Sequence, residues 1–225
     1  MKKWFKSFGY PEVVWLPKSE QSFLGFISIA FLLAMFATPY PQVAMWVGFL
    51  FAAYAAIAND SIQTIGTFIA SNQDKKWWVL WIFIGGVFCL TMLYSWLTLG
   101  GDVTHGRLAA KGFEVAPTEF HFLQVAAPIF LLILTRLRMP VSTTFILLTS
   151  FAASTNAVGK VLAKSMSGYV LAFALGLIFF MIVAKSAKKH FVGTAKPWWT
   201  VAQWITSGSL WAVWLTQDAA NIAVY

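Results

Sequence analysis

The sequence predicts an all-α protein: a polytopic bundle of membrane helices with inverted-topology repeats and discontinuous helices. Three observations lead to this prediction. Hydrophobic residues make up 59% of the 225 residues and charged residues only 11%, whereas soluble domains are about one quarter charged. Several apolar runs are long enough to cross a bilayer. A motif centred on an aspartate occurs twice, around Asp60 and around Asp218.

Composition also excludes other classes of protein. The single cysteine, Cys89, lies in an apolar run, so neither a disulfide framework nor a cysteine metal cluster is expected. The net charge is +8, but the basic residues lie between the apolar runs and not in one patch. We therefore attribute the positive charge to orientation in the membrane and expect no nucleic-acid partner.

The apolar runs divide the chain into one membrane domain with short flanking parts. Residues 1–21 mix lysines with aromatic residues, which is typical of a cytoplasmic segment lying at the lipid headgroups. Residues 22–208 form the predicted membrane domain with the first repeat, and residues 209–225 begin a second, inverted repeat. Crossings are predicted at residues 22–38, 43–72, 77–99, 122–134, 140–159, 169–184 and from 198 onward. For residues 140–159 a re-entrant or broken element is the alternative, and a hairpin that returns to the same side would move the lysines of residues 185–196 outside.

The distribution of lysine and arginine orients this bundle. With the amino terminus in the cytoplasm and one crossing per run, twelve basic residues lie inside and four outside, as the positive-inside rule requires of a plasma (inner) membrane protein. The inside set is Lys2, Lys3, Lys6, Lys18, Lys75, Lys76, Arg136, Arg138, Lys185, Lys188, Lys189 and Lys196, and the outside set is Arg107, Lys111, Lys160 and Lys164.

The first aspartate motif lies at predicted membrane depth. On a helix, Gln63, Thr64 and Thr67 follow Asp60 on the same face. A carboxylate with a polar stripe inside an apolar span usually lines a cavity or an ion path. The alternative is an aspartate at headgroup depth, with threonines that bond to their own helix.

The second motif repeats the first with its two amides exchanged. Asn59-Asp60-x-x-Gln63 corresponds to Gln217-Asp218-x-x-Asn221. In the predicted layout the first motif travels inward and the second outward, and these two aspartates are the acidic residues expected within the membrane. Motifs in opposite orientation are typical of inverted repeats with a site near the bilayer midplane.

A third polar segment separates the two motifs. Pro140 suits the first position of a helix, so Ser142, Thr143 and Thr144 are expected in its first turn. Unpaired backbone N–H groups there, together with the hydroxyls, would form an anion site. An ordinary N-cap at a span boundary is the other interpretation.

These three segments together resemble the inorganic phosphate transporter (PiT) family. Asn59-Asp60-x-x-Gln63-x-x-Gly66-Thr67 resembles its Gly-Ala-Asn-Asp-x-x-Asn-Ala-x-Gly-Thr signature, residues 140–144 resemble its Pro-Val-Ser-Thr-Thr-His element, and residues 217–221 resemble the start of its second Asn-Asp repeat. The resemblance implies cation-coupled symport of inorganic phosphate by alternating access. It assigns the coupling cation, Na⁺ or H⁺, to Asn59, Asp60, Gln63, Gln217, Asp218 and Asn221, and the phosphate to Thr64, Thr67, Ser142, Thr143 and Thr144.

The sequence departs from the family pattern in three ways. Gln63 and Gln217 replace asparagines, and Phe145 replaces the family's histidine. The family also has a second Pro-Val-Ser-Thr-Thr element after its second Asn-Asp motif, whereas this sequence ends at Tyr225. We expect either that it is part of a longer protein or that a second subunit, as in a homodimer, completes the site.

Charge considerations agree with a cation-coupled carrier in the lipid bilayer. No lysine or arginine is predicted within a span near Asp60 or Asp218, so helix N-termini, hydroxyls and bound cations would have to compensate an oxyanion. We expect no cofactor other than the coupling ion. An enzyme is not expected, because His105 and His121 fall at a loop and no catalytic triad lies within the spans. The alternatives are a proton-coupled permease for sulfate or another oxyanion, and a non-transporting membrane subunit.

Overall fold

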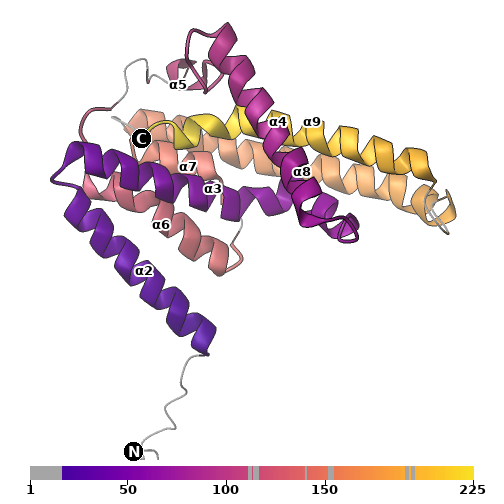
Figure 1. Cartoon of the computed structure of the whole chain (residues 1–225), viewed down its shortest axis with the longest axis horizontal. Helices are drawn as coiled ribbons and strands as arrows, with labels where there is room; N and C mark the ends of the chain where they lie inside the picture. Colours follow the sequence, from indigo (N-terminus) through magenta and orange to yellow (C-terminus); the bar gives the residue numbers. More distant parts are fainter. Residues whose placement is uncertain are drawn as a thin grey trace, which may run out of the picture.

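The structure, a computed structural model, describes residues 17–110, 113, 117–139, 141–151, 155–190, 193 and 196–225. The regular elements in these residues are all α-helices, which confirms the predicted all-α class. They are α2 (Lys18–Ala37), α3 (Pro41–Ser71), α4 (Trp77–Thr98), α5 (Arg107–Ala110), α6 (Phe122–Arg136), α7 (Thr143–Thr149), α8 (Thr155–His190) and α9 (Pro197–Ile222) (Figure 1). Most of the predicted segment 1–21 lies outside the described residues, and its end belongs to α2.

Four helices are long and apolar enough to cross a membrane, judged by length and composition. They are α2, the Pro41–Asn59 part of α3, α4 and the Ser165–Lys189 part of α8. The helix α6 is apolar but has only 15 residues, or about 22 Å at 1.5 Å per residue, less than a hydrocarbon layer of about 30 Å. The helix α9 covers the predicted last crossing but is not among the four.

Helix boundaries follow recognisable local signals. Proline stands at the first position of both α3 and α9, where its missing N–H costs nothing and its fixed φ favours the helix. At the start of α6, the backbone N–H of His121 donates to the side-chain oxygen of Gln124 at 2.7 Å, one half of a capping box. These signals explain why predicted and observed helix starts agree closely for α3, α6 and α9.

Small residues allow α2, α3 and α6 to pack closely. The buried alanines of this cluster are Ala30, Ala34, Ala37, Ala44, Ala55 and Ala126, and several are fully buried. In lipid, small side chains at an interface let helix backbones approach and gain van der Waals contact. This three-helix core supports the first half of α3, which leads directly into the first aspartate motif.

The helices α3 and α9 pack side by side in opposite directions. At one end, which we call the Asn72 anchor, the buried Asn72 side chain donates to Gln203 Oε1 at 3.2 Å and accepts from Trp204 Nε1 at 3.0 Å. At the other end, the Gly48 anchor, the ring of Tyr225 lies where a side chain on Gly48 would stand. The two aspartate motifs therefore lie on antiparallel neighbouring helices. Both helices run unbroken through their motifs.

The region from residue 140 to 159 corrects one prediction. It was expected to cross the membrane once, but it comprises the seven-residue helix α7 and the start of α8. The helix α7 folds back along α6, because Phe120 before α6 packs against Phe151 after α7, with ring centroids 6.1 Å apart. Seven residues span only about 10 Å, so α7 does not cross alone. The interruption in the helical pattern lies between α6 and α7.

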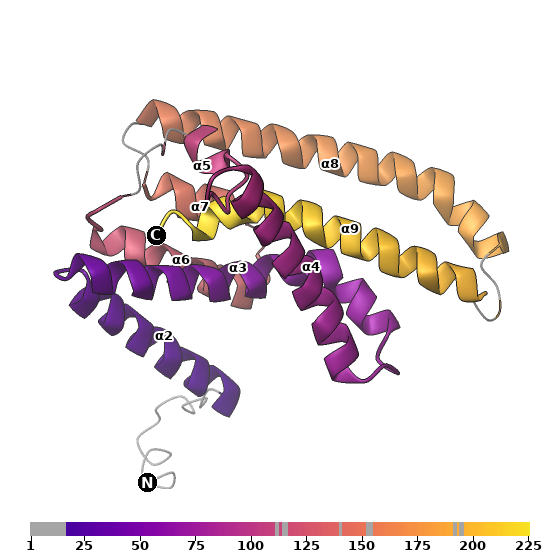
Figure 2. The same cartoon turned by 45° about the horizontal axis from the view of Figure 1, so that its top comes forward.

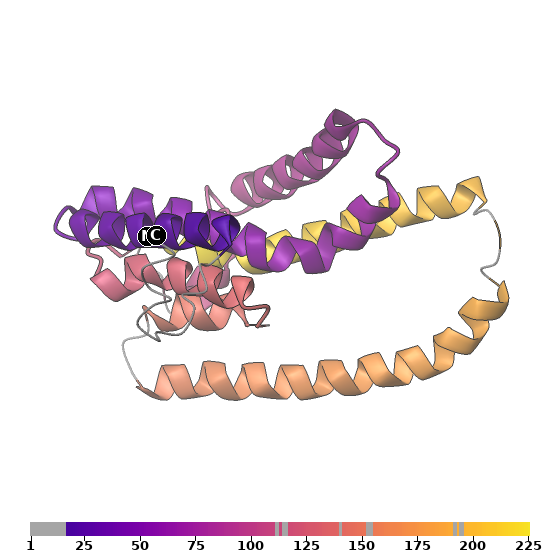
Figure 3. The ribbon, with the colours of Figure 1, turned by 90° about the horizontal axis from the view of Figure 1, so that it is seen from below.

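The long helix α8 packs against α7, and its apolar side chains beyond that contact remain exposed. Figure 3 shows it lying apart from the other helices. Val170, Phe173 and Ile182 are each about 70% exposed (73%, 74% and 69%). A helix that is hydrophobic all round and unburied by protein is typical of a membrane span in contact with lipid.

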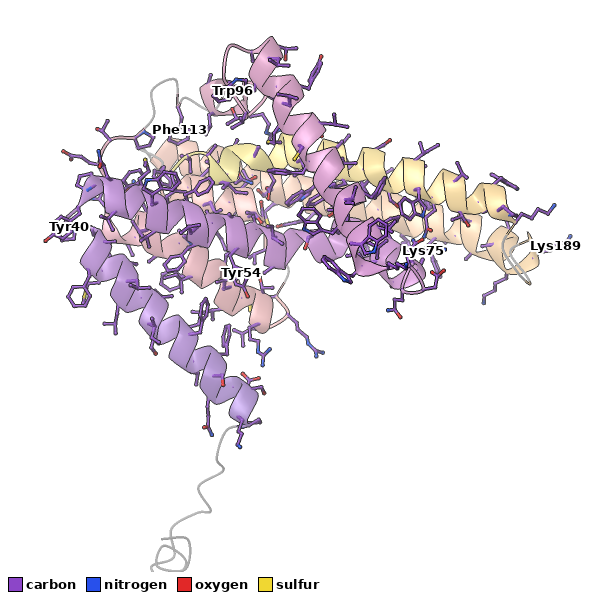
Figure 4. The ribbon with its side chains drawn as sticks, in the orientation of Figure 1. Tyr40, Tyr54, Lys75, Trp96, Phe113 and Lys189 are labelled. Atoms are coloured by element: carbon purple, nitrogen blue, oxygen red, sulfur yellow. The ribbon has the colours of Figure 1, made fainter. Side chains whose placement is uncertain are left out.

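The carboxyl end of α8 lies far from the start of α3 (Figure 4). Lys189, near the end of α8, lies at the end of the molecule opposite Tyr40, and Lys75, after α3, lies between them (Figure 4). The end of α8 and the start of α9 also lie at that end (Figure 2).

Candidate functional site

Asn59 joins the first aspartate motif to the segment around residue 142. Its side chain is 7% exposed. The Nδ2 group donates to the Val141 carbonyl at 3.1 Å and to Thr143 Oγ1 at 3.2 Å, and Oδ1 accepts from Thr135 Oγ1 at 3.0 Å. Residues more than 80 positions apart in sequence are thus held together by one amide. Thr135, at the end of α6, was not predicted as part of the site.

The structure describes only some side chains of the rest of the first motif, and these differ in burial. The side chains of Asp60 and Gln63 lie outside the part of the chain whose side chains the structure describes. Thr64 is half-buried, and its hydroxyl donates to the Ser61 carbonyl within α3 at 3.3 Å. Thr67 is exposed, one turn further along the helix. Of the predicted polar stripe, the two threonines that the structure describes therefore become more exposed along the helix.

The hydroxyl segment begins α7 as an N-cap. Ser142 Oγ accepts a hydrogen bond from the Phe145 backbone N–H at 3.2 Å, so the N-cap interpretation is confirmed for this residue. Thr143 is buried and bonded to Asn59, and Thr144 is half-buried. Pro140 lies outside the described residues.

The second motif is mostly buried. Asp218 is 6% exposed and Asn221 is fully buried. Asn221 Nδ2 donates to Asp218 Oδ1, one turn earlier on α9. The remaining amide oxygen, Asn221 Oδ1, has no hydrogen-bond partner among the described residues. A buried acceptor without a donor is costly, and an amide oxygen is a suitable ligand for a hard cation.

The two aspartates lie at similar heights along the paired helices. Asp60 lies twelve residues along α3 from either anchor, whereas Asp218 lies fourteen residues from the Asn72 anchor and seven from the Gly48 anchor. At 1.5 Å per residue the two backbone positions are offset by about 3 to 8 Å along the helix axis. The motifs, which are 158 residues apart in sequence, therefore lie within about 8 Å of each other along the axis of the α3–α9 pair.

Gln217 lies apart from the buried residues of its motif. Its side chain is exposed, and its Oε1 accepts a hydrogen bond from the Arg107 guanidinium through Nη1. The sequence assigned Arg107 to an outer loop, so this cation beside the second motif was missed. The lone sequence signal was the turn-forming Gly100-Gly101-Asp102, which shows that the chain reverses after α4 but not where Arg107 then lies.

The loop between α4 and α5 is ordered by Asp102. Its carboxylate accepts from the backbone N–H groups of Thr104 and Gly106, both at 2.6 Å, and Ser95 Oγ donates to its carbonyl at 2.6 Å. Burial raises the pKa of the Asp102 carboxyl, but the hydrogen bonds from Thr104 and Gly106 outweigh burial and hold that pKa below its usual range. The same loop presents Arg107 to α9.

The site is therefore built from α3, the α6–α7 turn, α9 and the start of α5. The helix α9 packs against α3, α7 and α5, and α7 lies beside the carboxyl end of α9 (Figure 1). The functional groups are carboxylate, amide and hydroxyl oxygens plus one guanidinium. Such oxygens favour hard cations such as Na⁺. A cluster of three or more His, Cys, Asp or Glu side chains is absent from the described part of the chain.

The chain was also compared with known proteins. No protein-family model, curated protein or solved structure matches it.

Proposed function

We propose that this protein is a secondary active transporter that couples a cation, Na⁺ or H⁺, to the movement of inorganic phosphate across a membrane. One observation carries the proposal. The Asn59 amide links the first aspartate motif to the hydroxyl segment, and the second motif packs against the same helix with Asp218 and Asn221 buried. This arrangement supports one polar site formed by three segments that are distant in sequence.

The chemistry of the second motif favours coupling to a cation. A carboxylate removed from water is costly unless a positive charge or a proton neutralises it. Asn221 supplies a buried amide oxygen close to Asp218, so the pair offers the oxygen ligands that Na⁺ accepts. A bound cation would also reduce repulsion between Asp218 and an incoming oxyanion. Each ligand would then raise the affinity of the other, which is the thermodynamic basis of symport.

The assigned roles follow from these positions. Asp60 and Asp218, with the amides of Asn59 and Asn221, would hold the cation. The hydroxyls of Thr143 and Thr144 would contact the phosphate beside α7. In alternating access, α6 and α7 would move relative to the α3–α9 pair, opening the site to one side of the membrane at a time.

Uptake of labelled phosphate into proteoliposomes tests this proposal. Uptake by the wild type should require an inward Na⁺ or H⁺ gradient and should fall by at least about tenfold in Asp60→Asn and Asp218→Asn. Asp74→Asn is the matched control, because Asp74 is exposed in a loop and pairs only with its neighbour Lys75 among the described residues. Gradient-driven uptake that persists in both site variants would refute the assigned role. Competition by sulfate across a pH series distinguishes a phosphate carrier from a proton-coupled sulfate permease.

A further inference from the structure

Arg107 brings a permanent positive charge to the second motif. It is the first residue of α5, and its guanidinium donates through Nη1 to Gln217 on α9. Gln217 precedes Asp218 and lies one helical turn before Asn221. Arginine stays protonated at all physiological pH values, so this charge does not depend on the cation that the site takes up.

The hydrogen bonding of Arg107 leaves one edge of its guanidinium unused. The Nε atom is buried and has no acceptor among the described residues, and the structure gives Nη2 no hydrogen bond there either. The Nε and Nη2 hydrogens point in the same direction, and this edge binds two oxygens of a phosphate or carboxylate at once. Gln217 occupies Nη1 and thereby fixes the orientation of the fork.

An oxyanion bound at this site would need a positively charged group such as the Arg107 guanidinium. An oxyanion entering beside Asp218 adds negative charge to a region that already holds this buried carboxylate. Hydroxyls and a bound cation offset part of this charge. A guanidinium that is already partly desolvated and held in place loses little freedom when it binds the anion.

We propose that the Nε–Nη2 edge of Arg107 binds the transported oxyanion, a tetrahedral phosphate-like dianion, and that Gln217 positions the guanidinium. This inference rests on the proposed function for the identity of the anion. It changes the source of charge compensation, because the positive charge comes from the α4–α5 loop and not only from coupling cations. The loop held by Asp102 then becomes part of the substrate site.

Anion binding to the purified full chain tests the inference separately from transport. Inorganic phosphate, added to protein in a detergent free of anionic lipid, should raise the melting temperature of the wild type. In Arg107→Gln the phosphate concentration for half-maximal stabilisation should rise by at least about tenfold. Arg107→Lys, which keeps the charge but loses the fork, should give an intermediate value. Arg138→Gln, at an exposed arginine after α6, is the matched control and should match the wild type.

The outcomes separate binding, structural and lipid-based explanations. If Arg107→Gln lowers the melting temperature without phosphate but responds to phosphate as the wild type does, Arg107 only fastens the loop to α9 and the inference is wrong. The inference is also overturned if inorganic phosphate does not raise the melting temperature of the wild type. The same holds if phosphatidylglycerol stabilises the wild type and inorganic phosphate does not. Phosphate binding that depends on Arg107, without gradient-driven uptake, would support the inference while refuting the proposed transport function.

Discussion

Replacing Asn59 by alanine should loosen the contact between α3 and the α6–α7 turn. The substitution removes three hydrogen bonds, to Val141, Thr143 and Thr135. A buried hydrogen bond is worth about 0.5–1.5 kcal/mol, and interhelical bonds in membranes average about 0.6 kcal/mol. Three bonds, with a buried carbonyl left without its donor, give a loss of about 2–4 kcal/mol in the free energy of unfolding. For a chain of this size, where 1 kcal/mol corresponds to about 2–4 °C, the melting temperature should fall by about 4–16 °C.

Thermal unfolding of the purified protein, followed by tryptophan fluorescence, measures this loss. Thr206→Ala is the matched control, because the Thr206 hydroxyl is exposed and donates to Ala202 within its own helix, so its removal should cost less than about 0.5 kcal/mol. A double-mutant cycle between Asn59→Ala and Thr143→Val should give a coupling energy of about 0.5–1.5 kcal/mol. Strict additivity, or an Asn59→Ala protein as stable as the control, would contradict the bridging role of Asn59.

Two further predictions concern the loop and the Gly48 anchor. Because hydrogen bonding lowers the folded-state pKa of Asp102, its carboxylate should stabilise the loop above about pH 4 and lose this effect as the pH falls through the lowered pKa. Hydrogen exchange at the amides of Thr104 and Gly106 should show this loss, and Asp102→Asn should remove the pH dependence; unchanged dependence would contradict it. Gly48→Ala should cost about 1–3 kcal/mol, since the added methyl overlaps the Tyr225 ring. Combining it with Tyr225→Ala should cost less than the two changes separately, and a fully additive loss would show that the ring is not the obstacle.

The sequence predicted the helices best where both ends carry a strong local signal. The crossing expected at residues 77–99 is α4 (Trp77–Thr98), and the one expected at 122–134 is α6 (Phe122–Arg136). Charged residues, proline or a capping residue mark these ends. Between residues 140 and 159 the sequence has no charged residue, and its polar residues are serines, threonines and one asparagine. Hydropathy cannot distinguish one crossing from a short returning helix there, because both bury the same kinds of side chain.

The candidate site was predicted in part for a similar reason. The two motifs and the hydroxyl segment were recognisable as polar groups within apolar runs, and the antiparallel packing of α3 and α9 brings them together. The hydrogen bonds of Asn59 could not be predicted, since they depend on how α6 and α7 fold back. The position of Arg107 depends on the path of a loop, and loops are poorly constrained by periodicity. The predicted inverted repeat still requires a test.

The two anchors limit how this protein can change shape. The α3–α9 pair is fastened near both ends, through Asn72 at one and the Tyr225 ring at the other. Two helices held together near both ends resist sliding along their axes, because any axial shift would disturb both anchors at once. We therefore expect that a movement exposing the buried Asp218 involves the short helix α7 and the loop that carries Arg107. Both parts pack against α9. The α3–α9 pair would keep its own geometry while α7 and the Arg107 loop move relative to it.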